Sequence, residues 1–213
     1  MFVDENSLKI TFLGETGIGK TSIINRICQS TFKENEASTV VGGCSQKEII
    51  IGKRKISCEL WDTAGQEKYL SVGRLLFKDA YIICLVYDIT RKDTFIAVKE
   101  KWLEEVKENG EKFQILGIVG NKSDMYEHEE VSEEEARQFA NEVDATFMLV
   151  SAKNGNNCDL LLKTLVTKFL KVGPNKLDEV FFFDDDQIRN KRVSYQISSD
   201  SIIDGKKKKK CCK

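Results

Sequence analysis

The amino-acid sequence predicts an α/β fold with three layers, in which a mostly parallel six-stranded sheet lies between helices. Strand-length apolar runs alternate along the chain with segments whose apolar residues recur every three or four positions, and this alternation favours parallel strands. Two neighbouring strand-like runs are instead separated by Gly52-Lys53-Arg54-Lys55, which predicts a hairpin and one antiparallel edge strand. A Gly-rich motif joins the first strand-like run to the first helical segment.

The individual elements follow from these patterns. Apolar runs predict strands at residues 8–13, 48–51, 56–61, 80–87, 113–120 and 145–150. Helical spacing predicts helices at residues 20–29, 95–109 and 161–170. A further helix is expected to begin at Ser132, because Ser132 and Glu135 form a capping-box pattern ahead of Ala136 and Phe139. Polar loops are expected at residues 31–45 and 63–79.

Length and composition favour one domain followed by a tail. The chain has 213 residues, of which 41% are hydrophobic, and a chain of this size can bury one substantial core. The helical periodicity stops at Gly173-Pro174. We therefore predict a domain at residues 1–173 and a flexible tail at residues 174–213.

Charge and hydropathy argue against several classes of protein. The formal net charge is −1, although five consecutive lysines, Lys206 to Lys210, lie near the C-terminus. The remainder of the chain is therefore acidic, which argues against a nucleic-acid-binding protein. No apolar run approaches the ~18 residues of a membrane-spanning helix, and the N-terminus lacks the regions of a signal peptide. We expect the body of the protein to be cytosolic.

The cysteines and the histidine suggest no metal site. None of the seven cysteines forms a C-x-x-C pair. Cys28, Cys58 and Cys84 lie in strand-like or helical patterns, so we expect reduced thiols that pack as small hydrophobic side chains. His128, the single histidine, lies in an acidic segment and is assigned no role.

Residues 14–21 read G-E-T-G-I-G-K-T and match the phosphate-binding motif G-x-x-x-x-G-K-[ST]. Between a strand and a helix, this loop directs backbone N–H groups and the positive end of a helix dipole at phosphate oxygens. Lys20 can reach the β- and γ-phosphates, and the Thr21 hydroxyl is the natural first ligand of Mg²⁺. The alternative is a Gly-rich turn without a ligand. The candidate phosphate-binding residues are Gly14, Glu15, Thr16, Gly17, Ile18, Gly19, Lys20, Thr21 and Ser22.

Polar residues also follow the later strands, where a parallel sheet binds its ligands. Asp62 ends one strand and can hold Mg²⁺ through water, while Gly65 lets a backbone N–H reach a γ-phosphate and Gln66 can orient a water molecule. In Asn121-Lys122-Ser123-Asp124, one carboxylate can accept two hydrogen bonds from guanine that adenine cannot donate. Ser151, Ala152 and Lys153 follow the last strand and could close over the base.

Taken together, the motifs resemble the Ras superfamily of small GTPases, and most closely the Rab family. They are G-E-T-G-I-G-K-T at 14–21, Thr39, W-D-T-A-G-Q-E at 61–67, N-K-S-D at 121–124 and S-A-K at 151–153, over residues 8 to about 171. Y-D-I-T at 87–90 is similar to the Rab pattern. The resemblance implies a small G domain of the P-loop NTPase fold and a GTP/GDP switch in vesicle traffic.

The resemblance assigns roles to residues in two loops. Thr39 lies 19 residues after Lys20, where the family has a threonine that ligates Mg²⁺ only beside a γ-phosphate. Phe32 lies 12 residues after Lys20, where the family has an aromatic ring that packs against guanine. Alternatively, Phe32 anchors the loop, and Thr39 is an ordinary solvated loop residue. Residues 33–45 and 63–79 correspond to the switch loops, which GTP orders.

The implied reaction is in-line attack of water on the γ-phosphoryl group, with Lys20 and Mg²⁺ stabilising charge and Gln66 orienting the water. Residues 33–41 contain no arginine, so we expect slow intrinsic hydrolysis, roughly 10⁻⁴ s⁻¹, and an activating protein that supplies charge. Activating proteins of the Rab family can also supply a glutamine, so the contribution of Gln66 to orienting the water is open. The other implied partners are an exchange factor, effectors and a prenylation chaperone, and the chain is expected to be a monomer.

Switch I departs from the Rab pattern T-[IV]-G-x-[DE]-F. Residues 39–44 read T-V-V-G-G-C, so Cys44 replaces the aromatic residue that helps to present the effector surface. Leu76 stands where the family has a tyrosine, whereas Trp61 is kept. Nucleotide chemistry should survive these changes, but the identity of the effectors is open.

The C-terminus carries Lys206 to Lys210 followed by Cys211 and Cys212. A terminal cysteine pair resembles the double geranylgeranylation signal of Rabs, and two lipid chains anchor a protein stably to a membrane. The lysines would add attraction to an anionic leaflet. The alternative is a solvated basic tail with unmodified thiols. Phe181-Phe182-Phe183 could dock on the body, bind a prenylation chaperone or end the last helix.

Two other functions are compatible with parts of the sequence. The first is a nucleotide-loaded scaffold that does not cycle, or a signalling GTPase of another Ras-superfamily branch, because switch I is unusual. The second is a metabolic P-loop ATPase or kinase, which residues 121–124 disfavour.

Overall fold

A computed structural model of the chain describes residues 7–33, 43–63, 79–109 and 114–172. The chain divides into two units, residues 1–181 and 182–213, and all described residues belong to the first unit. The switch residues Thr39, Gly65, Gln66 and Leu76 and the tail cysteines Cys211 and Cys212 lie outside the described residues.

The described strands form a six-stranded sheet in the order β2-β3-β1-β4-β5-β6. The strands are β1 (Leu8–Leu13), β2 (Gly43–Ile51), β3 (Arg54–Asp62), β4 (Ile82–Asp88), β5 (Ile115–Asn121) and β6 (Thr146–Leu149). Strand β2 pairs antiparallel with β3, and the other described pairs are parallel. The predicted fold class is therefore confirmed.

The edge strand β2 is longer than predicted. It begins at Gly43, where the sequence predicts a loop, and it pairs with β3 from Gly43 opposite Asp62 to Ile51 opposite Arg54. Because β2 lies at the sheet edge and its first half is only partly covered, that half lacks the apolar alternation by which a strand is recognised. The turn is also shorter than predicted, since residues 52 and 53 alone separate the strands and Gly52 takes a φ of 64°.

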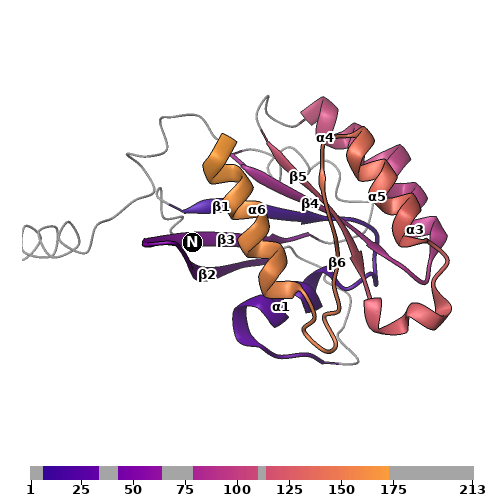
Figure 1. Cartoon of the computed structure of the whole chain (residues 1–213), viewed down its shortest axis with the longest axis horizontal. Coiled ribbons are helices and arrows are strands. Elements are labelled where there is room, and N and C mark those ends of the chain that lie inside the picture. Colours follow the sequence, from indigo (N-terminus) through magenta and orange to yellow (C-terminus); the bar gives the residue numbers. More distant parts are fainter. Residues whose placement is uncertain (1–6, 34–42, 64–78, 110–113, 173–213) are drawn as a thin grey trace, which may run out of the picture. The chain divides into compact units, whose positions relative to one another are not determined.

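Helices cover both faces of the sheet, as predicted (Figure 1). Helices α1 (Lys20–Gln29) and α6 (Cys158–Val172) lie on one face. The other face carries α3 (Lys92–Ala97), the π-helical turn η2 (Val98–Trp102), α4 (Leu103–Asn109) and α5 (Glu133–Glu142). The predicted helix at 95–109 thus begins earlier, at Lys92, and consists of two α-helical segments joined by a π-helical turn. The 3₁₀ helix η3 (Ser123–His128) was not predicted.

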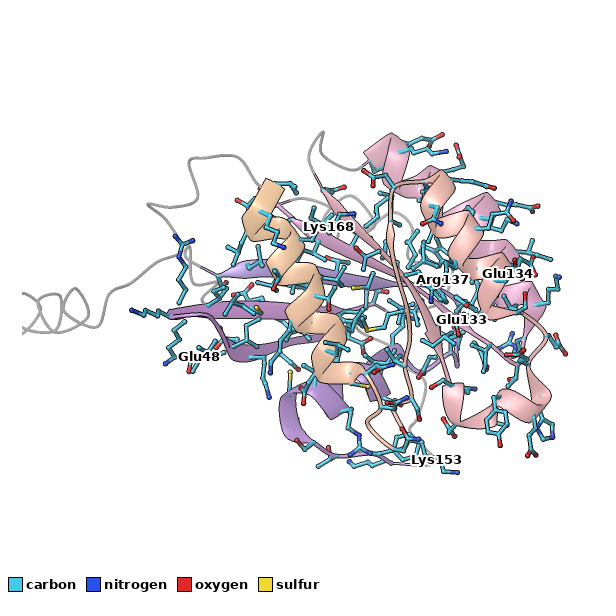
Figure 2. The ribbon with its side chains drawn as sticks, in the orientation of Figure 1. Glu48, Glu133, Glu134, Arg137, Lys153 and Lys168 are labelled. Carbon is cyan, nitrogen blue, oxygen red and sulfur yellow. The ribbon has the colours of Figure 1, made fainter. Side chains whose placement is uncertain are left out.

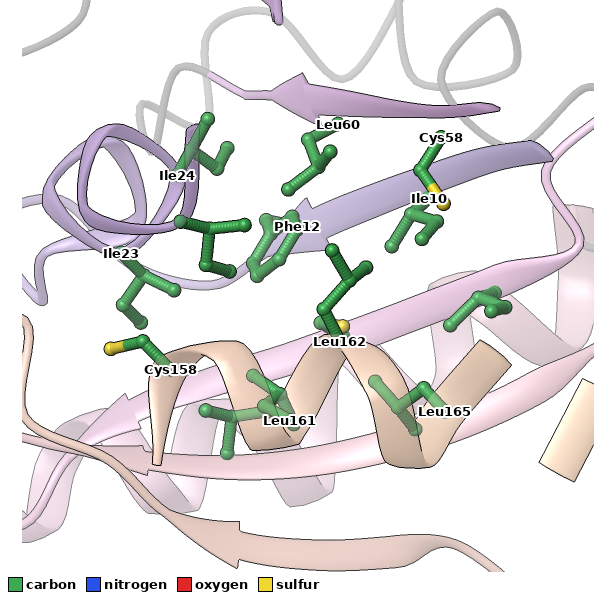
Figure 3. Packing of buried hydrophobic residues seen from close by; sticks show 14 of the residues in the cluster. Ile10, Phe12, Ile23, Ile24, Cys58, Leu60, Cys158, Leu161, Leu162 and Leu165 are labelled. Atoms are coloured by element: carbon green, nitrogen blue, oxygen red, sulfur yellow. The ribbon is translucent and has the colours of Figure 1, made fainter. Parts of the chain in front are cut away.

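Two buried clusters hold these layers together. On one face, Phe12 of β1 packs among side chains of α1 and α6, including Ile23 and Leu162 (Figure 3). On the other face, the ring of Phe95 lies 4.8 Å from that of Tyr87 and 5.7 Å from that of Phe139, measured between centroids. Burying each large apolar side chain contributes about 1.5–3 kcal/mol to folding. Every residue of β4 is buried, as expected for a central parallel strand.

One half of the predicted capping box, the cap by Ser132, is present at the start of α5, whereas the Glu135 carboxylate pairs with Lys92. The Ser132 hydroxyl accepts a hydrogen bond from the backbone N–H of Glu135 at 3.2 Å. Ala136 and Phe139 then point into the core. This cap fixes the position at which the helix begins.

All three cysteines predicted to pack as reduced thiols are free and belong to or pack against the core cluster on the α1 and α6 face. Cys58 and Cys84 are buried in the sheet, whereas Cys28 is only half-buried. Burial raises the pKa of Cys58 to about 12 and also raises the pKa of Cys84. Both thiols therefore stay protonated at neutral pH and pack as apolar groups. Within the described residues, no helix is both long and apolar enough to cross a membrane.

Candidate functional site

The loop at residues 14–19 joins the carboxyl end of β1 to the start of α1, and two of its glycines are required by close approaches. Gly14 has a φ of 143°, and a Cβ atom there would lie 2.3 Å from the carbonyl oxygen of Val86. Gly19 has a φ of 92°, and its Cβ would lie 2.4 Å from Nδ2 of Asn121. A side chain at Gly14 would therefore collide with the backbone of β4, and one at Gly19 would displace the side chain of Asn121.

Lys20 begins α1 and is buried within the loop, with 6% of its surface exposed. Its Nζ donates to the carbonyl oxygens of Gly14 and Glu15, both at 2.9 Å. Burial lowers the pKa of Lys20 to about 8, although the nearby negative charges of Asp62 and Glu15 oppose that shift. The ammonium group is thus held at the loop with too little negative charge nearby to offset its loss of water.

Thr21 and Asp62 bring two oxygen ligands together beside the loop. The Thr21 hydroxyl donates to Oδ2 of Asp62 at 2.6 Å. Asp62 is placed there by the parallel register of β1 and β3, in which Phe12 lies opposite Asp62. The hydroxyl of Thr63 donates to the carbonyl oxygen of Phe12 at 2.7 Å and fastens the end of β3 to β1.

This pair of oxygens suits a hard divalent cation. Mg²⁺ prefers oxygen ligands and is held by one or two protein groups, with water and phosphate oxygens completing its shell. In the ranges that the structure describes, no three His, Cys, Asp or Glu side chains gather into a cluster of ligands. The Thr21–Asp62 pair has the chemistry of a site for a Mg²⁺ ion that is shared with a bound phosphate.

Asn121 ends β5 and connects three segments. Its Nδ2 donates to the carbonyl oxygen of Ile18 at 2.7 Å, and its Oδ1 accepts from the backbone N–H of Ala152 at 3.2 Å. The side chain is 2% exposed, so both bonds are shielded from water. The phosphate-binding loop and the loop after β6 therefore lie on opposite sides of one buried amide.

Asp124 and Ser151 form the neighbouring contact. Oδ1 of Asp124, a half-buried carboxylate, accepts a hydrogen bond from the Ser151 hydroxyl at 2.6 Å. The Ser151 oxygen in turn accepts from the backbone N–H of Asn154 at 3.2 Å. These bonds fix the direction of the carboxylate at the edge of the sheet.

Lys122 is oriented by a buried acid that sequence reasoning did not assign. Nζ of Lys122 lies 2.6 Å from Oδ2 of Asp88, which is completely buried. The other carboxylate oxygen of Asp88 accepts from the backbone N–H of Thr90 at 3.0 Å and from its hydroxyl at 2.8 Å. The available signal was an acidic residue at the end of the apolar run at residues 80–87.

Arg26 was also missed, and it connects α1 to the loop after β6. Its Nε donates to the carbonyl oxygen of Ala152 at 2.8 Å, and its Nη2 donates to that of Lys153 at 2.6 Å. Nη1 donates to the carbonyl oxygen of Ser30 at 3.0 Å. Figure 2 shows Lys153 on this loop, apart from Glu133 and Arg137 of α5. No sequence motif marks Arg26, because it acts through backbone atoms of a distant segment.

The structure brings most of the predicted site residues to one edge of the sheet. Those with contacts across segments are Gly14, Glu15, Ile18, Gly19, Lys20, Thr21, Asp62, Asn121, Lys122, Asp124, Ser151, Ala152 and Lys153. Thr16, Gly17 and Ser22 lie in or directly after the same loop. Phe32 is half-buried against the core cluster on the α1 and α6 face, so its predicted contact with a base stays a prediction.

The fold and this edge define a P-loop nucleotide-binding domain. The sequence of residues 9–171 matches the family model of the Ras family. The chain is similar to the Ras-related protein Rab-25 of Canis lupus familiaris, with 33% identity over 169 residues that cover 79% of each chain. It is 34% identical over 169 residues to Rab-31 of Mus musculus, covering 79% of this chain and 86% of the relative.

A third relative extends the similarity along the chain. Rab-25 of Oryctolagus cuniculus is 31% identical over 209 residues, covering 96% of this chain and 92% of the relative. The chain therefore belongs to the Ras family and is a Rab-like small GTPase.

Proposed function

We propose that the chain is a switch in membrane traffic that alternates between GTP and GDP, and that the edge described above is its nucleotide site. The observation that carries the proposal is the buried side chain of Asn121, which joins the loop around Lys20 to the loop that holds Asp124. The loop around Lys20 and the loop that contacts Asp124 through Ser151 thus share one buried side chain, which supports a common nucleotide site.

Base recognition would fall to Asp124. Its carboxylate can accept two hydrogen bonds from the N1–H and the exocyclic amine of guanine. Ser151 supports this role because its hydroxyl fixes one carboxylate oxygen. Adenine offers no matching pair of donors, so its binding would leave a buried acceptor unpaired.

Phosphate binding and hydrolysis would fall to the opposite end. Lys20 would donate to phosphate oxygens in place of the two loop carbonyls that it contacts in the structure. Thr21, Asp62 and Thr39 would hold Mg²⁺, which supplies positive charge to the phosphates. Gln66 would orient the attacking water. A partner would supply the further positive charge that residues 33–41, which contain no arginine, do not.

Membrane attachment is proposed for the tail. Cys211 and Cys212 would carry two prenyl chains, and Lys206 to Lys210 would add attraction to an anionic membrane. An exchange factor, an activating protein, effectors and a prenylation chaperone would complete the cycle.

A second candidate is a nucleotide-loaded scaffold, which the β2–β3 hairpin favours. Cys44 lies opposite Trp61 in this hairpin, at the position where Rabs have an aromatic residue. A smaller side chain here changes the surface that would meet activating proteins and effectors. The scaffold would bind GTP without cycling.

Hydrolysis in a single turnover separates the two candidates. The full chain is loaded with GTP, and phosphate release is followed with and without Gln66→Leu. A switch predicts slow release by the native chain and slower release by the variant. A scaffold predicts no release from either protein.

Binding to vesicles, compared between the prenylated chain and a Cys211→Ser/Cys212→Ser variant, tests the proposed membrane anchor.

A further inference from the structure

Glu15 places a negative charge inside the phosphate-binding loop, directly after Gly14. Its Oε1 accepts hydrogen bonds from Nζ of Lys101 at 2.9 Å and from Nε1 of Trp102 at 3.1 Å. The side chains are only partly exposed, 22% for Glu15 and 28% for Lys101. The ion pair is thus better shielded from water than an ordinary surface pair.

Both donors belong to the π-helical turn η2, on the helical segment that covers the sheet face opposite α1. Successive side chains of a regular α-helix point about 100° apart. In η2, the neighbours Lys101 and Trp102 nevertheless reach the same oxygen atom, and Nζ of Lys101 lies 4.8 Å from the centre of the Trp102 ring. Short π-helical segments inside α-helices frequently occur at functional sites.

The charge of Glu15 acts on the loop itself. Glu15 and Asp62 are the two negative charges that favour the protonated form of Lys20. A carboxylate close enough to affect the lysine is also close enough to repel the phosphates that the lysine would bind. Asp62 accepts a hydrogen bond from Thr21 beside the loop. Glu15 instead accepts hydrogen bonds from Lys101 and Trp102.

We propose that Lys101 is a positioning residue for nucleotide binding, which neutralises Glu15 and holds its carboxylate toward η2. The inference rests on the proposed function, because it assumes that the loop binds nucleotide phosphates. It adds a role for the helical segment opposite α1 as a support of the phosphate-binding loop. A protein that bound this segment and displaced Lys101 would weaken nucleotide binding.

The test measures the affinity and dissociation rate of fluorescent GDP and GTP on the full chain with Mg²⁺. Lys101→Gln leaves the charge of Glu15 uncompensated, so we expect nucleotide to dissociate about five- to tenfold faster. The effect should be larger for GTP, which carries more negative charge, and smaller at high salt.

Glu15→Gln changes the charge in the opposite direction and keeps an acceptor for Trp102. We expect this variant to bind nucleotide at least as tightly as the native chain. The double variant Glu15→Gln/Lys101→Gln should return to within about twofold of the native dissociation rate, because both charges are removed. Lys107→Gln is the matched control: Lys107 is an exposed lysine of α4 that pairs with Glu104.

The outcomes separate this inference from the proposed function. If both single variants and the double variant release nucleotide faster, the cluster is only a structural brace and the inference is wrong. A Lys101→Gln variant that behaves as the native chain also overturns it, while nucleotide binding by the native chain still supports the proposed function. Failure of the native chain to bind guanine nucleotide would overturn both.

Discussion

The proposed base end of the site, residues 121–124 and 151–153, differs from the proposed phosphate end, residues 14–22 and 62–63, in how the protein satisfies the polar groups there. At the base end, Asn121 and Ser151 make hydrogen bonds within the protein. At the phosphate end, burial lowers the pKa of Lys20, because the surrounding protein offsets its charge only in part. Contacts within the protein thus stabilise the base end. A bound anion would stabilise the phosphate end, because it would offset the charge of Lys20.

The difference predicts opposite effects on folding. Removing a group at the base end breaks satisfied hydrogen bonds and should lower stability. Removing the buried charge at the phosphate end should relieve a desolvation cost. Bound nucleotide should therefore stabilise the native protein more than it stabilises a variant of the phosphate end.

The largest effect is expected for Lys20→Met. Guanine-nucleotide affinity should fall by about a thousandfold, because a charged donor to the phosphates is lost. The free energy of unfolding without nucleotide should rise by about 1 kcal/mol, because relief of the ammonium's desolvation outweighs the loss of its hydrogen bonds to the carbonyls of Gly14 and Glu15. Nucleotide titration and urea unfolding measure the two effects, with the exposed Lys163→Met of α6 as the control. Lower stability of Lys20→Met would contradict the comparison.

Asn121→Ala tests the base end. We expect the free energy of unfolding to fall by about 2 kcal/mol without nucleotide, because two buried backbone groups lose their partner. Guanine-nucleotide affinity should fall about a hundredfold, since the two loops lose their common support. Asn109→Ala serves as a control, because both described hydrogen bonds of the Asn109 side chain go to Glu105 of the same helix. Unchanged stability would show that Asn121 does not brace the loops.

Arg26→Gln sharpens the comparison within the base end. The guanidinium bonds the carbonyl oxygens of Ala152 and Lys153, so its loss should loosen the loop that orients Asp124 through Ser151. We expect GDP to dissociate about tenfold faster. Preference for GDP over inosine diphosphate, which lacks the exocyclic amine, should also decrease.

The control for Arg26→Gln is Arg137→Gln. Arg137 is an exposed residue of α5 that pairs with Glu133, apart from the loop at Lys153 (Figure 2). A general loss of stability would weaken binding of both nucleotides equally. An unchanged ratio of GDP to inosine diphosphate affinity would therefore show that Arg26 does not position the base loop.

The smallest effect is expected for Ser132→Ala, which removes the cap of α5. Loss of this hydrogen bond should cost about 1 kcal/mol of unfolding free energy. Nucleotide dissociation should not change, because the site contacts that the structure describes do not involve this side chain. Thermal unfolding and GDP release on the same sample check both parts, and faster release would connect α5 to the site.

Much of this architecture could be predicted from the sequence. Parallel strands bring their carboxyl ends to one edge, so Asp62, Asn121 and Ser151, each at the end of an apolar run, were expected near the loop around Lys20. Helix and strand positions followed from apolar periodicity, and the cap at Ser132 followed from its spacing to Glu135.

The features that were missed depend on contacts between distant segments. Arg26 bonds the backbone of the loop after β6, and Asp88 pairs with Lys122. Neither pair of partners is close in sequence, so no short motif predicts the contact. The π turn that contains Lys101 retains spacings of four residues among Val98, Trp102 and Val106, which also fit an α-helix. The first half of β2 is held by pairing with β3 and lacks an apolar face of its own.

The most direct test of the account is displacement of a fluorescent guanine nucleotide from the full chain in the presence of Mg²⁺. The account predicts tight binding that excess GTP or GDP displaces and excess ATP does not, because Asp124 selects the base and the loop around Lys20 holds the phosphates. Equal displacement by ATP, or no binding of guanine nucleotide, would contradict the assignment of the two ends.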